Sequence, residues 1–250
     1  MINLKSKVAL ITGASRGIGK ETALLFASVG CDLVINYNKS KSSAEETSNQ
    51  VRKYGIKAEI FKADIGSYSE VLRLVDFGMD KFKKIDILVN NAGIWEYSRI
   101  DELTPDKLEK TMRINLSGVF YLTQKVSRVM IKQKYGNIIN VSSTAGQRGE
   151  PFHSHYAASK GAVISLTKSL AVELAPYNIR VNCVAPGWVD TDMSHQALLD
   201  EKEEILGKIP LGRAAKPEEI AGPILFLASD LSSFVNGEIL NVNGGAVLCG

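Results

Sequence analysis

The stretch Val8–Gly19, which reads VALITGASRGIG, decides the fold class of this 250-residue chain. It opens with a short apolar run typical of a buried strand and leads into a helix predicted over Ile18–Val29. Gly13, Gly17 and Gly19 let the backbone between them turn sharply and approach a bound group closely. Backbone N–H groups and the dipole at the start of the helix favour a phosphate there. The spacing therefore predicts a dinucleotide site, with a turn that serves packing alone as the alternative.

Short apolar runs and longer amphipathic segments alternate along the rest of the chain. Strands are predicted at Val8–Thr12, Asp32–Asn36, Ala58–Lys62, Ile85–Asn90, Asn137–Ser142, Arg180–Ala185 and Glu238–Val242. Helices are predicted at Ile18–Val29, Ser42–Tyr54, Ser69–Phe82, Thr104–Gln133, His155–Ala175 and Pro217–Ala228. Thr104 is the expected N-cap of its helix, with Pro105 in the first turn.

Because the predicted strands are almost continuously apolar, they indicate a parallel sheet covered on both faces. The expected fold class is therefore α/β, a doubly wound seven-stranded Rossmann fold that forms a single domain over residues 1–250. The segment at about 187–216 has no predicted strand and suits a lid or substrate loop.

Composition and charge exclude several classes of function. The formal net charge is +3, and basic residues form no stripe of the kind that binds nucleic acid. No apolar run is long enough for a signal peptide or a membrane span. Cys31, Cys183 and Cys249 are an odd number at wide spacing, which is typical of a reduced chain rather than a disulfide framework. We therefore expect a cytoplasmic protein that binds neither nucleic acid nor membrane.

A second informative pattern is Tyr156 followed by Lys160, since a spacing of four places both side chains on one helix face. An ammonium beside a phenol favours the phenolate and should lower a pKa that starts near ~10. Such a tyrosine can exchange a proton near neutral pH. A Tyr/Lys pair alone is also common on protein surfaces. Together with the glycine turn, it predicts redox chemistry on a carbonyl or an alcohol.

The ordered motifs of the chain resemble the short-chain dehydrogenase/reductase family, in its compact branch of about 250 residues. The matching motifs are Thr12-Gly13-x-x-x-Gly17-x-Gly19, Asp64, Asn90-Asn91-Ala92-Gly93, Asn115, Ser143, Tyr156-x-x-x-Lys160, Pro186-Gly187 and Val242-Asn243-Gly244-Gly245. The resemblance covers Val8 to Gly245 and is specific because the motifs occur jointly at these spacings. It implies hydride transfer between a nicotinamide and a carbonyl or alcohol, without a metal.

The resemblance assigns catalytic roles to four residues. Tyr156 would be the general acid in reduction and the base in oxidation, and Ser143 would hydrogen-bond the carbonyl oxygen. Lys160 would lower the Tyr156 pKa and hold the nicotinamide ribose. Asn115 would hold a water that links Lys160 to solvent, although a buried amide at a helix kink is the alternative. Ser142 is the neighbouring candidate for the serine role, but Ser143 has the family's spacing from Tyr156.

The resemblance also implies a cofactor site built from the ends of several strands. Its expected residues are Gly13, Ser15, Arg16, Gly17, Ile18, Gly19, Asn36, Asn38, Asp64, Ile65, Asn91, Ala92, Gly93, Tyr156, Lys160, Pro186, Gly187, Val189 and Thr191. Asp64 would hydrogen-bond the adenine amino group, with an ordinary turn aspartate as the alternative.

The choice of cofactor is expected to depend on the end of the second predicted strand. This region reads Asn36-Tyr37-Asn38-Lys39-Ser40-Lys41 and lacks the acid that usually holds the ribose of NAD. Arg16, assisted by Lys39, could pair with a 2′-phosphate. We therefore expect NADP(H) in preference to NAD(H), the alternative being that both side chains are merely solvated.

Substrate contacts are expected from the loops that follow the strands, since ligands lie at the carboxyl ends of such sheets. The candidates are Ser143, Trp95, Gln147, Arg148, His153, Trp188 and Met193. These mostly apolar and aromatic side chains suit a medium-sized carbonyl compound, with Arg148 or His153 contacting an anionic or hydroxylated one. His153, His155 and His195 all fall in these regions, but a two-residue spacing is weak evidence, so no metal site is expected.

Within the family the pattern is most similar to the 3-oxoacyl-(acyl-carrier-protein) reductases, notably over Val181–Met193. Those enzymes dock an acidic carrier protein through basic residues. Lys134 can fill one such place, whereas Tyr177 stands at the other, so docking of an acyl-carrier protein is left open. Sugar, polyol and general alcohol dehydrogenases share the same core motifs and are the alternative. A dinucleotide-sensing regulator would be expected to lack Tyr156 or Lys160.

The resemblance finally implies a homotetramer. In the family, the helices that correspond to Thr104–Gln133 and His155–Ala175 form a four-helix interface between subunits. Here those helices carry apolar residues at positions expected to face outward, namely Phe120, Leu122, Leu166 and Leu170. The alternative is that the two helices only cover the sheet.

Overall fold

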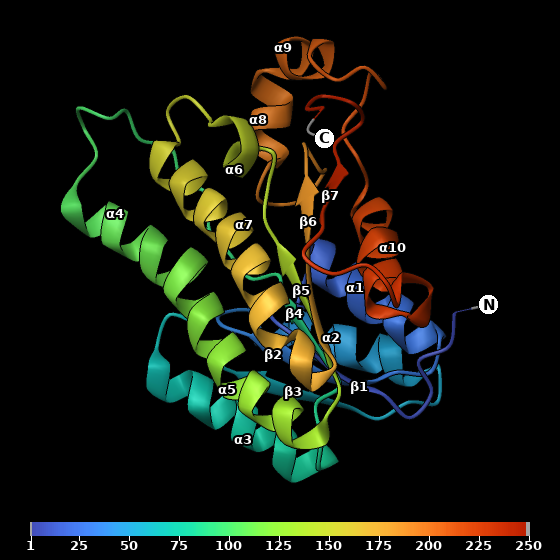
Figure 1. The fold of residues 1–250 in the computed structure, drawn as a ribbon. Coiled ribbons are helices and arrows are strands. Elements are labelled where there is room, and N and C mark those ends of the chain that lie inside the picture. Colours follow the sequence, from blue (N-terminus) through green and yellow to red (C-terminus); the bar gives the residue numbers. More distant parts are fainter. Residues whose placement is uncertain (1, 249–250) are drawn as a thin grey trace.

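The computed structural model describes residues 2–248, and its strands form one sheet (Figure 1). The strands are β1 Val8–Ile11, β2 Asp32–Tyr37, β3 Ala58–Lys62, β4 Ile87–Asn90, β5 Gly136–Val141, β6 Ile179–Pro186 and β7 Ile239–Val242. Their order in the sheet is β3-β2-β1-β4-β5-β6-β7, and every neighbouring pair is parallel. The predicted seven-stranded parallel sheet is confirmed, with strand ends that differ from the expected ones only slightly.

Helices cover both faces of this sheet. They are α1 Gly17–Ser28, α2 Lys41–Arg52, α3 Tyr68–Phe82, α4 Pro105–Met112, α5 Gly118–Gln133, α6 Ala145–Arg148, α7 Ser154–Leu174, α8 His195–Asp200, α9 Lys202–Gly207 and α10 Pro217–Ala228. In Figure 1, α1, α2 and α10 lie on one side of the strands, and α3, α5 and α7 lie on the other. The doubly wound arrangement expected from the sequence is therefore confirmed.

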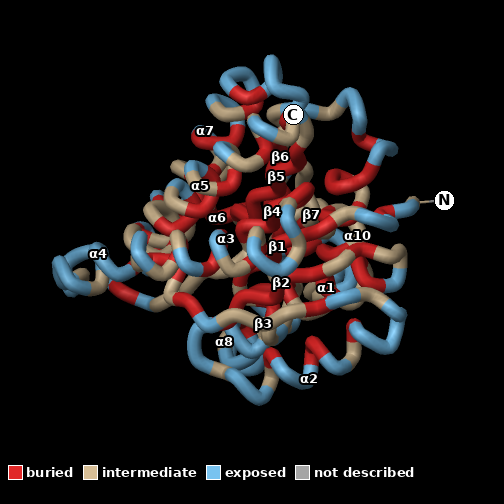
Figure 2. The backbone as a smooth tube through the Cα atoms, turned by 90° about the horizontal axis from the view of Figure 1, so that it is seen from below, coloured by how far each residue is buried: buried red, intermediate tan, exposed pale blue. Residues whose placement is uncertain are grey.

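Two hydrophobic cores hold the layers together, one on each face. Ala9 and Ile11 of β1 face one core, where they pack with Phe26 of α1. Leu10, the residue between them, faces the other core with Leu74 of α3. Figure 2 shows the strands as the buried centre of the molecule. Because each fully buried side chain of this size contributes about 1.5–3 kcal/mol, the two cores hold the strand ends rigidly in place.

The long helical stretch predicted over Thr104–Gln133 is confirmed, but it contains a π-helical turn that the sequence did not indicate. Thr104 Oγ1 accepts a hydrogen bond from Lys107 N at 3.3 Å and Pro105 begins α4, so the predicted cap is confirmed. Residues Arg113–Ser117 then form a π-helical turn, η1, between α4 and α5. The buried Asn115 side chain ties this turn to the loop after β4, which explains why an extra residue is accommodated there.

Two of the apolar positions expected to face outward are buried. Leu122 is fully buried in the core beneath α5, and Leu166 packs against Val119 and Val163. The expectation for these two is wrong, because the face of α5 and α7 that carries them turns toward neighbouring helices of the same subunit. Phe120 is half exposed, as expected.

The segment 187–216 contains α8 and α9, which the sequence did not indicate (Figure 1). Its two ends are held together by a parallel bridge between Val189 and Ala215. Asp190 N donates to Ala215 O at 2.8 Å, and Ala215 N donates to Trp188 O at 2.9 Å. The segment is thus closed at its base, and its helices stand beyond the carboxyl end of β6. None of the helices in residues 2–248 has both the length and the apolar character needed to cross a membrane.

Candidate active site

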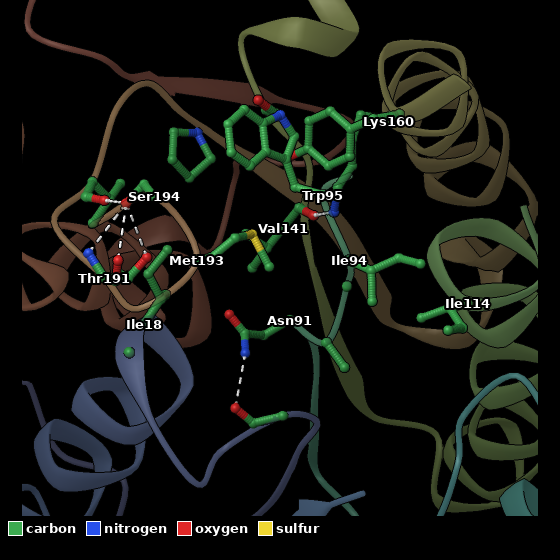
Figure 3. A pocket seen from close by; sticks show the side chains of 18 of the residues that line it. Ile18, Asn91, Ile94, Trp95, Ile114, Val141, Lys160, Thr191, Met193 and Ser194 are labelled. Carbon is green, nitrogen blue, oxygen red and sulfur yellow. Dashed lines mark hydrogen bonds between the residues drawn. The ribbon is translucent and has the colours of Figure 1, made fainter. Parts of the chain in front are cut away.

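A cavity of about 410 Å³ lies at the carboxyl ends of the strands, around the point where the strand order reverses between β1 and β4. Its lining begins at the glycine turn after β1, passes the ends of β2 to β6, and ends at Tyr156 and Lys160 on α7. Figure 3 shows Asn91 and Trp95, from the loop after β4, and Met193, from the segment after β6, projecting into the same space. The topology therefore brings together the two sequence patterns that predicted the chemistry.

The glycine turn is shaped by backbone geometry that only glycine adopts easily. Gly13 has a φ of 64° and Gly17 a φ of 53°. A Cβ atom at Gly19 would lie 2.5 Å from the carbonyl oxygen of Gly13, so this glycine lets α1 pack tightly against the turn. Among the described residues, the first turn of α1 contains no acid, so the positive end of its dipole is not offset by a carboxylate. The turn fits the phosphates of a dinucleotide.

Nearly all of the residues predicted to bind the cofactor line this cavity. They are Gly13, Ser15, Arg16, Gly17, Ile18, Asn36, Asn38, Asp64, Ile65, Asn91, Ala92, Gly93, Tyr156, Lys160, Pro186, Gly187, Val189 and Thr191. Gly19 is the exception, because it lies behind the turn and serves packing. Asn36 has a largely structural side chain, since it accepts from Gly13 N and donates to Ala63 O.

Asp64 and Arg16 each have a partner within the protein. Asp64 Oδ2 pairs with Arg113 Nη1 at 2.9 Å and its Oδ1 accepts from Gly66 N, so the turn role foreseen as an alternative is present. Arg16 Nη1 lies 3.2 Å from Asp192 Oδ2 across the cavity. Both side chains of that pair are mostly exposed, so the pair contributes at most about 1 kcal/mol and leaves Arg16 free to bind a stronger anion.

The two neighbouring serines at the end of β5 have different environments. Ser142 is buried and donates its hydroxyl proton to the carbonyl oxygen of Lys160 at 2.8 Å. Ser143 lines the cavity, accepts from Ala145 N at 3.1 Å, and stands beside Tyr156. The geometry therefore favours Ser143 for contact with a substrate, in line with the preference from sequence spacing.

The pKa of Tyr156 is set mainly by burial. Burial raises the Tyr156 pKa to about 12, the Ser143 hydroxyl opposes this shift, and the charge of Glu150 adds to it. Lys160 Nζ donates to Val141 O at 2.8 Å and lies 5.8 Å from the centre of the Tyr156 ring (Figure 3). In this arrangement burial therefore outweighs any lowering of the Tyr156 pKa by Lys160. Burial instead lowers the pKa of Lys160 itself to about 8.

Asn115 lies directly behind the cavity wall. Its side chain is fully buried, with Oδ1 accepting from Ile94 N at 2.8 Å and Nδ2 donating to Ile94 O at 2.9 Å. A Cβ atom at Gly93 would lie 3.3 Å from Asn115 Oδ1 and 3.5 Å from Lys160 Nζ. Because Gly93 has no side chain, the cavity wall between Asn115 and Lys160 is thin. The π-helical turn is what presents Asn115 to this point.

The predicted substrate residues divide into two groups. Trp95, Arg148, Trp188 and Met193 line the cavity with Ser143, whereas Gln147 and His153 do not. Gln147 donates its amide to Asn241 Oδ1, away from the cavity. His153 lies behind Trp95, with the two rings stacked at 4.2 Å between centres. Residues 2–248 hold no cluster of three or more side chains that could bind a metal.

Two residues of the site were not foreseen from the sequence. Glu150 lines the cavity and accepts a hydrogen bond from Trp95 Nε1 at 3.2 Å. Ser194 hydrogen-bonds Thr191 and the carbonyl oxygen of Val189, which fixes the start of the 187–216 segment (Figure 3). An acid in the short loop before Tyr156 was a visible signal for Glu150, but its orientation depends on the tertiary contact with Trp95.

Comparison with known proteins agrees with this geometry. The family model described as enoyl-(acyl carrier protein) reductase matches residues 13–247. The 3-oxoacyl-(acyl-carrier-protein) reductase of a Synechocystis strain is 43% identical, covering 99% of this chain and 100% of its own. A reductase of the same name from Thermotoga maritima is 42% identical, with coverage of 99% and 100%.

Solved structures extend the likeness to other reactions. An NAD+-bound xylitol dehydrogenase is 36% identical, has a TM-score of 0.91, and is covered over 97% of this chain and 99% of its own. A short-chain dehydrogenase from Burkholderia cenocepacia in complex with NADP is 34% identical, with a TM-score of 0.91 and coverage of 98% and 99%. The fold and the site define a pyridine-nucleotide-dependent oxidoreductase. The chain belongs to the short-chain dehydrogenase/reductase family.

Proposed function

We propose that this oxidoreductase is an NADP(H)-dependent reductase of 3-oxoacyl thioesters. The observation that carries the proposal is one cavity that joins the glycine turn to Tyr156 and Ser143 beneath a wall of aromatic side chains. Full-length similarity to reductases named for 3-oxoacyl-acyl-carrier-protein substrates supports the thioester class. A sugar, polyol or general alcohol dehydrogenase is the second candidate, which the likeness to a xylitol dehydrogenase favours.

The residues of the chain account for the protonic half of such a reaction. A bound nicotinamide dinucleotide supplies the hydride. Because burial raises the Tyr156 pKa to about 12, Tyr156 is protonated at neutral pH and suited to donate a proton to the oxygen of the carbonyl being reduced. The Ser143 hydroxyl is placed to stabilise negative charge on that oxygen. Lys160, Asn115 and the thin wall at Gly93 form the proposed route by which Tyr156 recovers its proton.

The preference for NADP(H) is part of the proposal. At the end of β2 the cavity lining comes from Asn36, Asn38, Lys39 and Ser40, so no carboxylate there competes for a 2′-phosphate. Arg16 is held only by an exposed ion pair with Asp192 and is available to such a phosphate. Arg16→Ala should raise the KM for NADPH by about tenfold and leave that for NADH almost unchanged. Equal effects on both cofactors would contradict the assignment of Arg16 to the 2′-phosphate.

The reaction is tested by NADPH consumption, followed by absorbance, with acetoacetyl-CoA as a soluble 3-oxoacyl thioester. Turnover would support the proposed function. No turnover by folded protein that binds NADPH would contradict the thioester assignment and favour the second candidate. Xylitol with NADP+ or NAD+ then serves as the probe of that candidate, because it tests oxidation of a polyol.

We further propose that residues 187–216 act as a lid over the substrate. The base of the lid is fixed by the bridge between Val189 and Ala215, and most residues from Trp188 to Ser194 contribute to the cavity lining.

We also propose that the protein is a cytoplasmic homotetramer and that its substrate is a 3-oxoacyl group carried by an acyl-carrier protein. The exposed apolar residues Phe120 and Val172 on α5 and α7 support association of subunits. Light scattering that gives the mass of a monomer would contradict the tetramer.

A further inference from the structure

The wall of the cavity nearest to Tyr156 contains a carboxylate among aromatic rings. Trp95 Nε1 donates to Glu150 Oε1 at 3.2 Å, which holds the carboxylate toward the cavity. The Trp95 ring stacks on His153 at 4.2 Å and meets the edge of Trp188 at 5.9 Å between centres. The rings of His153 and Trp188 hold the Trp95 ring in place, and Trp95 in turn holds the Glu150 carboxylate. The position of the negative charge therefore does not depend on a mobile surface side chain.

The groups around Glu150 compensate its negative charge only in part. Burial raises the Glu150 pKa, while the Trp95 bond and the Arg148 guanidinium oppose that shift. His153 Nδ1 lies 3.8 Å from Glu150 Oε1, but burial lowers the His153 pKa, so this ring is neutral at neutral pH. The charge of Glu150 also raises the Tyr156 pKa, which places the reacting hydroxyl within its electrostatic reach. Arg148 is an exposed part of the lining.

We propose that Glu150 sets the charge selectivity of the substrate cavity, favouring substrates that are neutral beside the reacting carbonyl and repelling those with a carboxylate there. The inference rests on the proposed function, because that function defines whether the cavity should favour neutral or carboxylate-bearing substrates. A 3-oxoacyl thioester masks the carboxyl group that the free 3-oxo acid exposes, so one partly buried negative charge can distinguish the two. Arg148 carries the opposite charge and is an exposed part of the same cavity lining.

The test compares ethyl acetoacetate with acetoacetate, which lacks the ethyl group and carries a negative charge, in the holoenzyme with NADPH. The quantity measured is the ratio of their kcat/KM values, because steps common to both substrates cancel in it. Wild-type enzyme should prefer the neutral ester by about a hundredfold, and Glu150→Gln should reduce that preference by about tenfold or more. Glu150→Gln retains an oxygen that can accept the Trp95 bond, so it changes the charge and little else.

Arg148→Gln is the matched control, since it removes a charge of opposite sign from the same loop. It should leave the ratio unchanged or increase it, whereas a merely structural role for this loop would move both variants alike. A ratio that is equal in wild type and Glu150→Gln overturns the inference.

The two proposals fail separately. Turnover of the ester without turnover of acetoacetyl-CoA would contradict the thioester function, and the ratio would still report on Glu150. Turnover of acetoacetyl-CoA with an unchanged ratio in Glu150→Gln would support the function and contradict the charge selectivity.

Discussion

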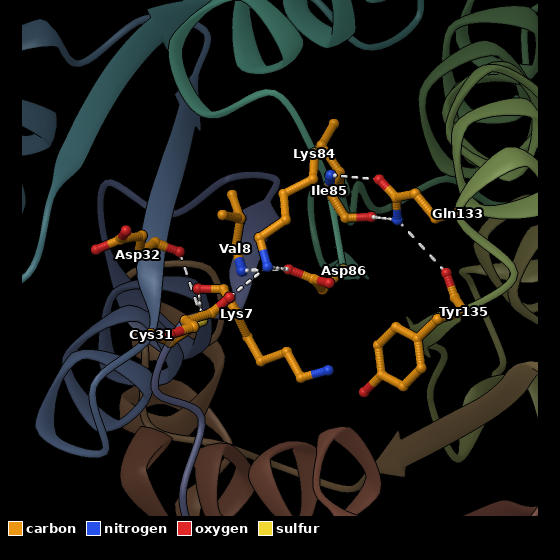
Figure 4. A network of polar contacts seen from close by, with 10 residues as sticks. Lys7, Val8, Cys31, Asp32, Lys84, Ile85, Asp86, Gln133 and Tyr135 are labelled. Carbon is orange, nitrogen blue, oxygen red and sulfur yellow. Dashed lines mark hydrogen bonds and ion pairs between the residues drawn. The ribbon is translucent and has the colours of Figure 1, made fainter.

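The amino and carboxyl ends of the parallel strands, here called the amino edge and the carboxyl edge of the sheet, carry polar residues with opposite roles. At the amino edge, Asp86 Oδ2 accepts from Val8 N at 2.8 Å and from Lys84 Nζ at 3.0 Å (Figure 4). Gln133 bonds both backbone groups of Ile85, at 3.2 and 3.0 Å. At the carboxyl edge, glycines keep side chains out and leave a cavity of about 410 Å³.

This difference shows how one sheet serves both stability and chemistry. At the amino edge each polar group completes the bonding of another group in the protein, and Asp86 is almost fully buried. At the carboxyl edge, Lys160 is buried and Tyr156 is half-buried, and the pKa values of both are moved away from their ordinary ranges. Shifts of this kind in a cleft are typical of functional sites. Variants at the carboxyl edge should therefore change catalysis, and variants at the amino edge should change stability.

The largest effect is expected for Tyr156→Phe. The variant keeps the ring and removes only the hydroxyl that donates the proton, so kcat with acetoacetyl-CoA should fall by about a thousandfold or more. The melting temperature should hardly change. Activity above about a tenth of the wild-type value would show that another group supplies the proton and would break the contrast between the two edges.

The next effect separates the two serines at the end of β5. Ser143→Ala should lower kcat by about a hundredfold with little loss of stability, because its hydroxyl faces the cavity. Ser142→Ala should instead cost about 1–2 kcal/mol of unfolding free energy, since its buried hydroxyl donates to Lys160 O. Steady-state kinetics and denaturant unfolding of both variants give the comparison. The reverse pattern would assign the catalytic role to Ser142.

At the amino edge, Asp86→Ala should lower the unfolding free energy by about 3 kcal/mol, because it leaves Val8 N and the Lys84 ammonium without their carboxylate. The kcat of the protein that is still folded should equal that of wild type. Asp76→Ala is the control: its ion pair with Lys125 is exposed on the aspartate side and should contribute less than about 1 kcal/mol. A similar loss of unfolding free energy in Asp86→Ala and Asp76→Ala would contradict the claim that burial makes the contacts of Asp86 the stronger ones.

The smallest predicted effect is a pH dependence of stability from Lys160. Burial lowers its pKa from 10.5 to about 8, so between these values the unfolded chain binds a proton that the folded protein lacks. The folded state therefore gains stability as pH rises through this window. Relative to Lys160→Met, wild type should gain about 2 kcal/mol between pH 8 and 10.

Denaturant unfolding at a series of pH values measures this difference. Burial raises the Cys183 pKa to about 12, which makes stability fall above about pH 9. The comparison is therefore made in a Cys183→Ala background, because Lys160 lowers the Cys183 pKa and this contribution would not cancel between the two proteins. A difference that does not vary with pH would mean that folding does not lower the pKa of Lys160.

Much of the fold was predictable because its signals are local. The apolar runs indicated all seven strands, and Thr104 with Pro105 indicated where α4 begins. The π-helical turn at Asn115 was not predictable, since it depends on bonds from that side chain to Ile94, a residue in a distant loop. The burial of Leu122 likewise depends on which face of α5 meets the core.

The candidate site was predictable where a motif fixes both residue type and position. Tyr156 and Lys160 lie one helix turn apart, and the glycines require positive φ, so their placement follows from backbone geometry. Gln147 lies in the one-turn helix α6 and His153 in the loop after it, where sequence does not say which way a side chain points. The structure turns both away from the cavity and turns Glu150 toward it.

Short-range backbone preferences and the burial of apolar runs encode the class of fold, the dinucleotide turn and the Tyr156–Lys160 pair, so these could be predicted from the amino-acid sequence. The pKa values of the site and the lining of the substrate cavity depend on tertiary packing and could not. Desolvation depends on everything packed around a group, so the Tyr156 pKa is raised although a lysine is its neighbour in sequence. Tertiary packing likewise places Glu150 in the same cavity lining as Tyr156, where its charge raises the Tyr156 pKa.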